Sequence, residues 1–189
     1  MVIIGELKAP LKHSKDNMQI FLLGQTKTGK TTLANTICHI LPERNYLHYE
    51  AGYWAREEFP MKTKDDEFSQ TYRNNLTQYA LQKLKNNPQY SYTKYNNWLT
   101  KHKERNIIIS GVRNPDDLIM MMSLSKENKF IFINADTNFK GLINDFEKGL
   151  RIIKDYLSWK QSIFNNISIL EMNDLDSLDI EQLKDFLNE

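Results

Sequence analysis

Short apolar runs along the chain end at a glycine or a polar residue, which is the pattern of strands buried in a parallel sheet. The first run, Met18–Leu23 (MQIFLL), ends at Gly24, and a β-branched run, Asn106–Ser110 (NIIIS), ends at Gly111. Weaker runs of the same kind cover Tyr46–Glu50, Phe130–Asn134 and Ile167–Leu170. The pattern therefore predicts a parallel sheet of about five strands.

Between these runs, apolar residues recur at helical spacing. From Lys30 to Leu41 the spacing predicts a helix that Pro42 ends. Residues 66–85 form an amphipathic pattern, and its apolar face carries Phe68, Tyr72, Leu76, Tyr79 and Leu84. Further helices are predicted over 89–105, over 118–124 after the helix-start signal Asn114-Pro115, over 138–159 and over 180–187. Because strands alternate with helices, we expect a three-layer α/β/α fold in a single domain of residues 1–189.

The composition fits a soluble globular protein. Of the 189 residues, 40% are hydrophobic and 26% are charged, and the net charge is +1. No apolar run approaches the length of a membrane span, so no membrane partner is expected, and the amino-terminal residues lack the apolar core of a signal peptide. A single cysteine, Cys38, forms no internal disulfide, which fits a reducing cytoplasmic setting.

Residues 24–31, GQTKTGKT, match the phosphate-binding pattern G-x-x-x-x-G-K-S/T, the Walker A motif. Its glycines allow the backbone to aim N–H groups at phosphate oxygens, and the following helix adds the positive end of its dipole. Lys30 is expected to bridge the β- and γ-phosphates of ATP, and the Thr31 hydroxyl is expected to bind Mg²⁺. The predicted nucleotide-binding residues are Gly24, Thr28, Gly29, Lys30, Thr31 and Thr32.

Beyond this loop, the chain resembles the nucleoside monophosphate kinase group of P-loop proteins. Adenylate kinases carry T-G-D-L-L-R-E after the second strand, and residues 51–57 here read AGYWARE. Their third strand ends D-G-x-P-R; residues 110–113 here, SGVR, are also similar to the strand-end D-V-R of phage-type deoxynucleoside monophosphate kinases and dephospho-coenzyme A kinases. The resemblance implies a phosphotransferase that acts on a nucleoside or deoxynucleoside monophosphate, or on a related small acceptor.

The resemblance also implies roles for residues outside the loop. Arg56 and Arg113 are expected to bind phosphate, for which the guanidinium fork is suited. The helical part of residues 46–105 is expected to bind the acceptor, and a lid-like helix over 138–163 to bring cations onto the transferred group. The predicted acceptor-binding residues are Glu50, Gly52, Tyr53, Trp54, Arg56 and Arg113, and the predicted catalytic residues are Lys30, Glu50, Arg113 and Arg151.

One expected carboxylate is missing from this pattern. Many of these kinases carry an acid at the end of the third strand, where this chain has Ser110. Asp116, Asp117 and Glu50 are the alternatives for that charge, and the sequence does not choose among them. Glu50 also stands where deoxynucleoside kinases place a general base for a hydroxyl acceptor, whereas a phosphate acceptor needs no base. Its other role is a loop acid or a salt bridge to Arg56.

The segment 83–105 is basic and aromatic, with six basic residues and one acid. Such a segment binds single-stranded nucleic acid by stacking and phosphate contact, or else forms an amphipathic helix over the acceptor site. Two rival functions therefore stay open beside a kinase for small acceptors. One is a kinase for a hydroxyl on nucleic acid, such as a modified base in DNA. The other is a non-catalytic or regulatory nucleotide-binding protein.

Overall fold

A computed structural model describes residues 17–25, 27–60, 69–102, 105–134, 143–163, 167–176 and 178–188. Its elements, in chain order, are β1 (Met18–Gly24), α1 (Lys30–Ile40), a 3-10 turn η1 (Pro42–Arg44), β2 (Tyr46–Glu50), α2 (Tyr53–Glu58), α3 (Gln70–Asn86), α4 (Tyr90–Thr100), β3 (Asn106–Ser110), α5 (Pro115–Met122), β4 (Glu127–Ile133), α6 (Ile143–Ile163), β5 (Ile167–Met172) and α7 (Ile180–Asn188).

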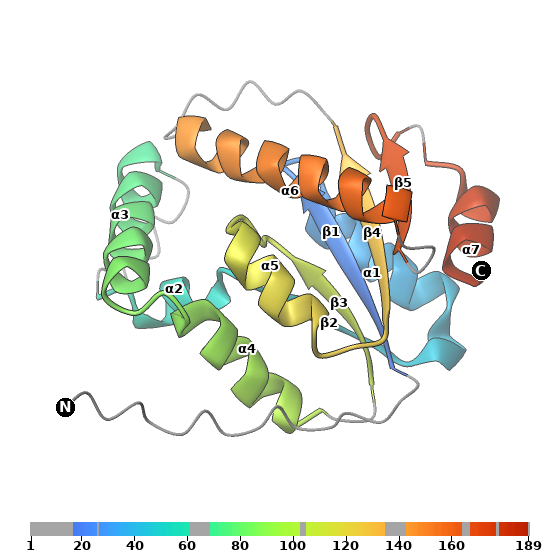
Figure 1. Cartoon of the computed structure of the whole chain (residues 1–189), viewed down its shortest axis with the longest axis horizontal. Helices are drawn as coiled ribbons and strands as arrows, with labels where there is room; N and C mark the ends of the chain where they lie inside the picture. The colour runs from blue at the N-terminus through green and yellow to red at the C-terminus, as the bar shows by residue number, and fades with distance from the viewer. Residues whose placement is uncertain are drawn as a thin grey trace.

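The strands form one five-stranded sheet in the order β2-β3-β1-β4-β5, and every neighbouring pair is parallel (Figure 1). The central strand β1 pairs with β3 on one side and with β4 on the other. Glu50, the last residue of β2, stands in register with Ser110, the last residue of β3. The carboxyl ends of these strands therefore meet at one edge, where parallel α/β sheets bind their ligands.

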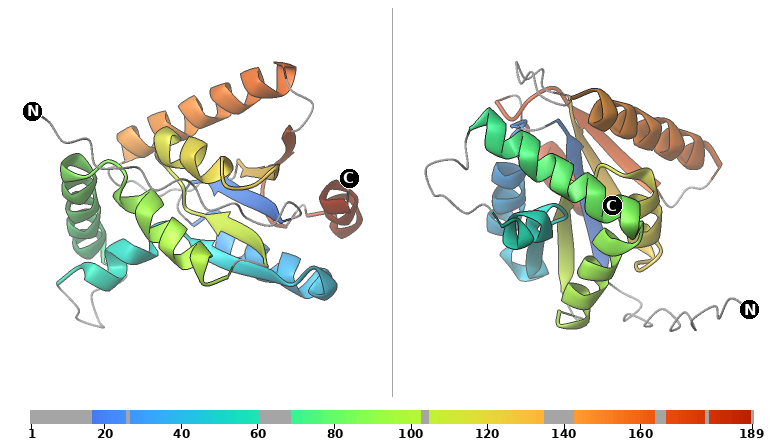
Figure 2. Two further views of the ribbon diagram at one scale, coloured as in Figure 1. Left: turned by 60° about the horizontal axis from the view of Figure 1, so that its bottom comes forward. Right: turned by 90° about the vertical axis from the view of Figure 1, so that its left-hand side faces the viewer.

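Alternate residues of the strands supply two separate cores, as the twofold repeat of a strand requires. Phe21, Ile109 and Phe130 pack with α4, α5 and α6 on one face. Ile20, Ile108 and Ile131 pack with α1 and α7 on the other face. Figure 2 shows α5 and α6 on one side of the sheet and α1 on the opposite side. The predicted three-layer α/β/α fold is thus confirmed.

The predicted strands and helices agree with the structure except at several ends. β4 starts at Glu127, earlier than the predicted Phe130, because the polar side chains that follow Glu127 find buried partners. Asn128 donates to the carbonyl of Met122 at 3.2 Å, and Lys129 donates to the carbonyl of Phe186 at 2.7 Å. The helix predicted over 89–105 ends at Thr100. There the backbone N–H of Lys101 turns back to the carbonyl of Trp98 at 3.0 Å.

One helix start follows its sequence signal. The side chain of Asn114 accepts the N–H of Asp116 at 3.1 Å before the predicted proline of α5. Of the helix predicted over 66–85, residues 66–68 lie outside the described residues, and α3 starts at Gln70. Ser69, which was predicted to be helical, is the extended cap before it and accepts the N–H of Tyr72 at 3.1 Å. The six-residue α2 was not predicted, because it has neither a side-chain cap nor a full apolar period. Within the described ranges, no helix is long and apolar enough to cross a bilayer.

Candidate active site

The predicted phosphate loop lies between β1 and α1, at the carboxyl edge of the sheet. Its backbone enters the left-handed region at Lys27 (φ 69°) and at Gly29 (φ 86°). At the start of α1 no acid stands in the first turn and no side chain caps the helix, and Thr31 and Thr32 are exposed. No side chain therefore caps the first N–H groups of this helix, which suits the phosphates that the motif predicts.

Gly24 is required where the loop leaves the sheet. A Cβ atom at this position would lie 2.6 Å from the carbonyl oxygen of Ile133 in the neighbouring strand β4. The φ of Gly24 is 149°, which side-chain-bearing residues rarely adopt. The first glycine of the motif thus holds the loop against β4.

Lys30 lies over this loop. Its Nζ donates to the carbonyl of Gly24 at 3.0 Å, to the carbonyl of Gln25, and to the hydroxyl oxygen of Thr28 at 3.2 Å. Burial, aided by the positive charge of Arg113 and opposed by Glu50, lowers the pKa of Lys30 to about 8. An anion placed beside this ammonium group would favour its charged form, as the phosphates of ATP would do.

Thr28 is a buried residue of the loop itself. Its hydroxyl donates to the carbonyl of Gln25 at 3.0 Å. This hydroxyl and the Nζ of Lys30 share Gln25 as a partner, so the loop keeps its curvature through contacts of its own.

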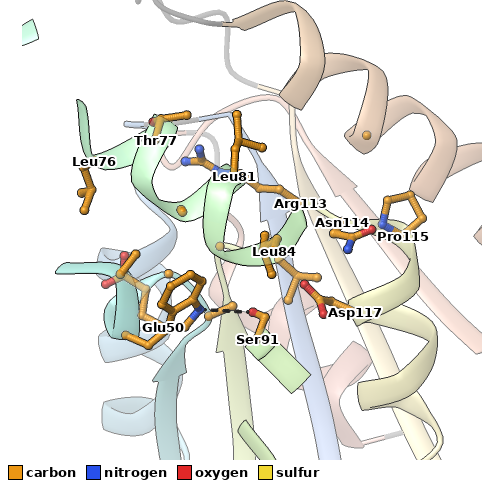
Figure 3. Close-up of a pocket in the computed structure, with 18 of the residues that line it drawn as sticks. Glu50, Leu76, Thr77, Leu81, Leu84, Ser91, Arg113, Asn114, Pro115 and Asp117 are labelled. Atoms are coloured by element: carbon orange, nitrogen blue, oxygen red, sulfur yellow. Dashed lines mark hydrogen bonds between the residues drawn. The ribbon is translucent and has the colours of Figure 1, made fainter. Parts of the chain in front are cut away.

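A second feature, which we call the helix-walled pocket, opens beside the loop at the same edge of the sheet. Its volume is about 620 Å³, and it lies between α2, α3, α5 and α6 and the residues that follow β2 and β3 (Figure 3). Of the predicted acceptor-binding residues, Glu50, Gly52, Trp54, Arg56 and Arg113 line it. The exception is Tyr53, which is 52% exposed and lies outside the lining.

Glu50 and Arg56, which both line this pocket, form a bidentate ion pair. The two guanidinium nitrogens of Arg56 donate to the two carboxylate oxygens of Glu50 at 2.8 and 2.5 Å. Burial by itself would raise the pKa of Glu50, but the hydrogen bonds and charge of Arg56 lower it below its usual range. The base candidate and the phosphate-binding candidate are therefore direct partners in this structure.

Arg113 connects the pocket to the loop. It is partly buried, and burial lowers its pKa, an effect that Glu50 opposes and Arg56 reinforces. Its charge is also one of the causes of the lowered pKa of Lys30. An anion bound between a desolvated guanidinium and its cationic neighbours would stabilise their charged forms.

Ser110, where the strand-end acid was expected, is buried against a histidine. Its hydroxyl lies 2.8 Å from Nε2 of His48 on the adjacent strand β2. Burial lowers the pKa of His48, so this pair is neutral near pH 7. Of the three alternatives for the missing acid, Asp116 is exposed and outside the pocket lining, and Asp117 is buried in the pocket. Of the three, Glu50 is the one whose charge shifts the pKa of Lys30.

The helix α6 brings further cations to the loop. Arg151 and Lys154 line a smaller cavity of about 420 Å³ together with Gly24 and Gln25. Lys154 is paired with Glu171 at 2.7 Å, and Asn134 donates to the same carboxylate oxygen at 3.1 Å. Ile153 and Leu157 of this helix are fully buried, so its inner face forms part of the core. The predicted lid residues 138–142 lie outside the described residues.

Gly149 allows α6 to lie directly on the segment that carries Arg113. A Cβ atom at Gly149 would be 2.4 Å from the backbone carbonyl oxygen of Arg113. We expect Gly149→Ala to lower the free energy of unfolding measured in urea and to weaken turnover, because the helix must move away from Arg113. Helix propensity alone predicts the opposite, a gain of about 1 kcal/mol, and such a gain would contradict the contact. Ser158→Ala, on an exposed position of the same helix, is the matched control.

The basic aromatic segment 83–105 uses most of its rings for packing. Tyr95 is fully buried against Tyr49, with ring centroids 4.9 Å apart, and Trp98 stacks on His102 at 4.3 Å. Lys83 and Lys94 both pair with Glu58, at 3.7 and 2.6 Å. These contacts pack α4 on the sheet and tie both α3 and α4 to Glu58 of α2, and binding of nucleic acid by this segment stays a prediction.

The described residues contain no group of three or more His, Cys, Asp or Glu that could hold a metal ion by itself. Magnesium in a P-loop site takes few ligands from the protein and the rest from phosphate and water. The exposed side chain of Thr31, whose hydroxyl is a hard oxygen ligand, fits that requirement. ATP with Mg²⁺ is therefore compatible with the residues present.

Comparison with protein-family models found no match, and comparison with curated proteins found none either. Among solved structures, shikimate kinase from Aquifex aeolicus is 18% identical, with a TM-score of 0.39 over 90% of this chain and 94% of that chain. A chain of the PezAT toxin–antitoxin system of Streptococcus pneumoniae is 16% identical, with a TM-score of 0.45 over 86% and 71%. A sugar kinase from Janibacter is 11% identical, with a TM-score of 0.42 over 92% and 95%.

These similarities are too distant to indicate a substrate. The parallel sheet and the strand–loop–helix that carries the Walker A residues make the chain an α/β protein with the P-loop fold. Any statement about its reaction has to rest on the site itself.

Proposed function

We propose that the protein is an ATP-dependent phosphotransferase, in which the loop binds the donor and the helix-walled pocket binds a small acceptor. The observation that carries this proposal is the electrostatic link between the two. Arg113 and Glu50 line the pocket, and their charges also shift the pKa of Lys30 in the loop, Arg113 downward and Glu50 upward. A group transferred from the loop toward the pocket would pass between these side chains.

Each residue then has a defined task. Lys30 and the first N–H groups of α1 hold the β- and γ-phosphates, and Thr31 would hold Mg²⁺, which neutralises phosphate charge when bound. Arg113 orients the acceptor and stabilises negative charge on the transferred group. Arg151, beside Gly24, adds positive charge from α6. The chemistry requires positioning and charge compensation more than covalent participation by the protein.

The charges of the pocket favour a phosphate-bearing acceptor, a nucleoside or deoxynucleoside monophosphate. Four cationic side chains and two carboxylates line the pocket, and one of the carboxylates is already paired with Arg56. The cations are Arg56, Lys85, Arg113 and Lys148, and the carboxylates are Glu50 and Asp117. An incoming phosphate would compete with Glu50 for the fork of Arg56 and would bind Arg113 as well.

The second candidate is a hydroxyl acceptor, on a nucleoside or on a modified base in nucleic acid. The position of Glu50 in the lining of the pocket favours it, because a carboxylate there can take a proton from a hydroxyl group. In this case Arg56 would position the base and would not bind the acceptor.

Labelled ATP decides among these functions. The full chain is incubated with γ-labelled ATP, Mg²⁺ and separate acceptors: nucleoside monophosphates, nucleosides, and DNA that contains modified bases. We expect label in the monophosphates. Label in DNA alone would overturn the proposal in favour of the nucleic-acid kinase. Tight ATP binding without transfer to any acceptor would favour a regulatory nucleotide-binding protein.

Glu50→Gln separates the two kinase mechanisms. For a phosphate acceptor, we expect kcat to fall by less than about tenfold, because an ionised phosphate oxygen needs no base. For a hydroxyl acceptor, kcat would fall by about a hundredfold or more, because the general base is lost. Steady-state kinetics with the best acceptor measures the difference. Glu43→Gln, at an exposed position in η1, controls for the loss of one acid.

A further inference from the structure

The floor of the helix-walled pocket holds a buried carboxylate. Asp117 of α5 is only 5% exposed and lies beside Ser91 of α4, beneath Leu84 of α3 (Figure 3). The Oδ1 atom of Asp117 has no hydrogen-bond partner within the part of the chain that the structure describes. A buried carboxylate oxygen without a partner is costly, so its presence in a pocket points to a ligand that supplies the missing donor.

The rest of this carboxylate is held firmly. Burial raises the pKa of Asp117 to about 6, while hydrogen bonds from Ser91, Asn114 and the backbone N–H of Tyr92 oppose the rise. The indole Nε1 of Trp54 donates to the Ser91 hydroxyl at 3.3 Å and so fixes that partner. These contacts fasten α4 to α5, which gives Asp117 a structural role. They do not account for Oδ1, which is itself closed to water, although the carboxylate lies in the lining of the pocket beside Ser91 and Leu84 (Figure 3).

The walls above Asp117 are apolar. Leu76, Leu81 and Leu84 of α3 face Val112 and Ile152 across the lining of the pocket. Leu81 and Ile152 are 38% and 53% exposed, which leaves large apolar side chains open to water at the edge of the pocket. A flat ring between these walls would cover them and reach the carboxylate with its edge.

We propose that Asp117 selects the acceptor through hydrogen bonds to the edge of the acceptor's ring, and that it favours a guanine-type base. This inference rests on the proposed function, because it takes the acceptor to be a nucleotide. A guanine-type ring presents neighbouring imino and amino N–H donors, which suit an ionised carboxylate, since such a group only accepts hydrogen bonds. An adenine-type ring places a ring-nitrogen acceptor beside its amino group, and the lone pair of that nitrogen would face the carboxylate without a proton between them.

The test compares guanosine and adenosine monophosphates as acceptors at pH 8, where Asp117 is ionised. We expect kcat/KM of the wild-type protein to favour the guanine acceptor by about tenfold or more, as hydrogen bonds to a charged group allow. Asp117→Asn should remove most of this preference through a higher KM for the guanine acceptor, because an amide has its own N–H donors. Asp155→Asn, at an exposed position on α6, should leave the preference unchanged.

A purely structural Asp117 would give a different result. Activity toward both acceptors would then fall by the same factor in Asp117→Asn, and that outcome would overturn the proposal. If this variant does not fold, the wild-type protein decides: a preference for guanine of less than about threefold, below the effect of one charged hydrogen bond, overturns it as well.

Binding measurements keep this inference separate from the proposed reaction. Calorimetric titration of the wild-type chain with each monophosphate, in the absence of ATP, reports the base preference without phosphoryl transfer. Tighter binding of the guanine nucleotide with no transfer would support Asp117 while refuting the kinase. Transfer to monophosphates with equal binding of both bases would support the kinase while refuting the role of Asp117.

Discussion

Replacing Lys30 with Ala is expected to lower phosphoryl transfer by at least about a hundredfold, the cost of removing a group aimed at charge in the transition state. Lys30 is half-buried over the loop, and its ammonium group already bonds to three loop oxygens, so the charge is held where the phosphates would lie. The measurement is the steady-state rate of ADP formation at saturating acceptor, with calorimetry for ATP affinity.

Lys126→Ala is the control for that experiment. Lys126 is exposed just before β4, at the end of the sheet opposite the loop. The substitution therefore removes the same kind of side chain from a surface position. Retention of wild-type turnover by Lys30→Ala, with normal folding, would mean that the loop does not bind the reacting phosphates. The Walker A assignment would then be wrong.

Replacing Arg113 with Ala should have the next largest effect, again about a hundredfold or more on kcat/KM, because charge-assisted bonds to phosphate are lost. Arg113 lines the pocket, and its charge lowers the pKa of Lys30, so it is positioned to touch both substrates. Kinetics with varied acceptor concentration gives kcat and KM separately, and we expect both to change.

Arg113→Lys refines this prediction. Lysine keeps the charge but loses the planar fork, so activity should stay well below that of the wild type. Arg44→Ala, in η1, removes an arginine that bonds to Asn188 outside the pocket, and its kinetics should be unchanged. Equal activity of Arg113→Ala and Arg44→Ala would show that Arg113 does not belong to the active site.

The fold was predictable because its signals are local. Runs such as NIIIS end at the carboxyl edge of the sheet, and alternation of strands with helices is enough to give a parallel sheet with two covered faces. The ends of elements were harder to predict, because they depend on distant partners. The early start of β4 requires Lys129 to reach the carbonyl of Phe186, which lies in α7, and no local pattern reveals that contact.

The apolar face of α3 shows a second limit. Its spacing of Tyr72, Leu76 and Leu84 predicts a helix with a buried stripe, and Tyr72 is indeed buried. Leu76 and Leu84, however, line the helix-walled pocket. Periodicity indicates that a face avoids water, but a core and a ligand pocket satisfy that condition equally well.

The site residues also divide into those predicted from a local motif and those whose partners lie far away in the sequence. The loop residues follow from a contiguous motif, so their placement was predictable. The sequence offered a salt bridge to Arg56 as one role for Glu50, and the structure shows that pair. The pairing of Asp117 with Ser91 joins residues far apart in the chain, as does that of His48 with Ser110. The sequence offered Asp117 only as an alternative for the missing strand-end acid, because an acid in the first turn of a helix usually serves the helix itself.

The most direct test of the central claim is whether the loop and the helix-walled pocket bind one continuous ligand. A conjugate that joins adenosine to the acceptor nucleoside through a chain of phosphates should occupy both sites at once. With Mg²⁺ present, its Kd by calorimetry should be at least about a hundredfold lower than that of ATP, because the second group binds at a high effective concentration. A Kd equal to that of ATP would show that the two features do not form a single active site.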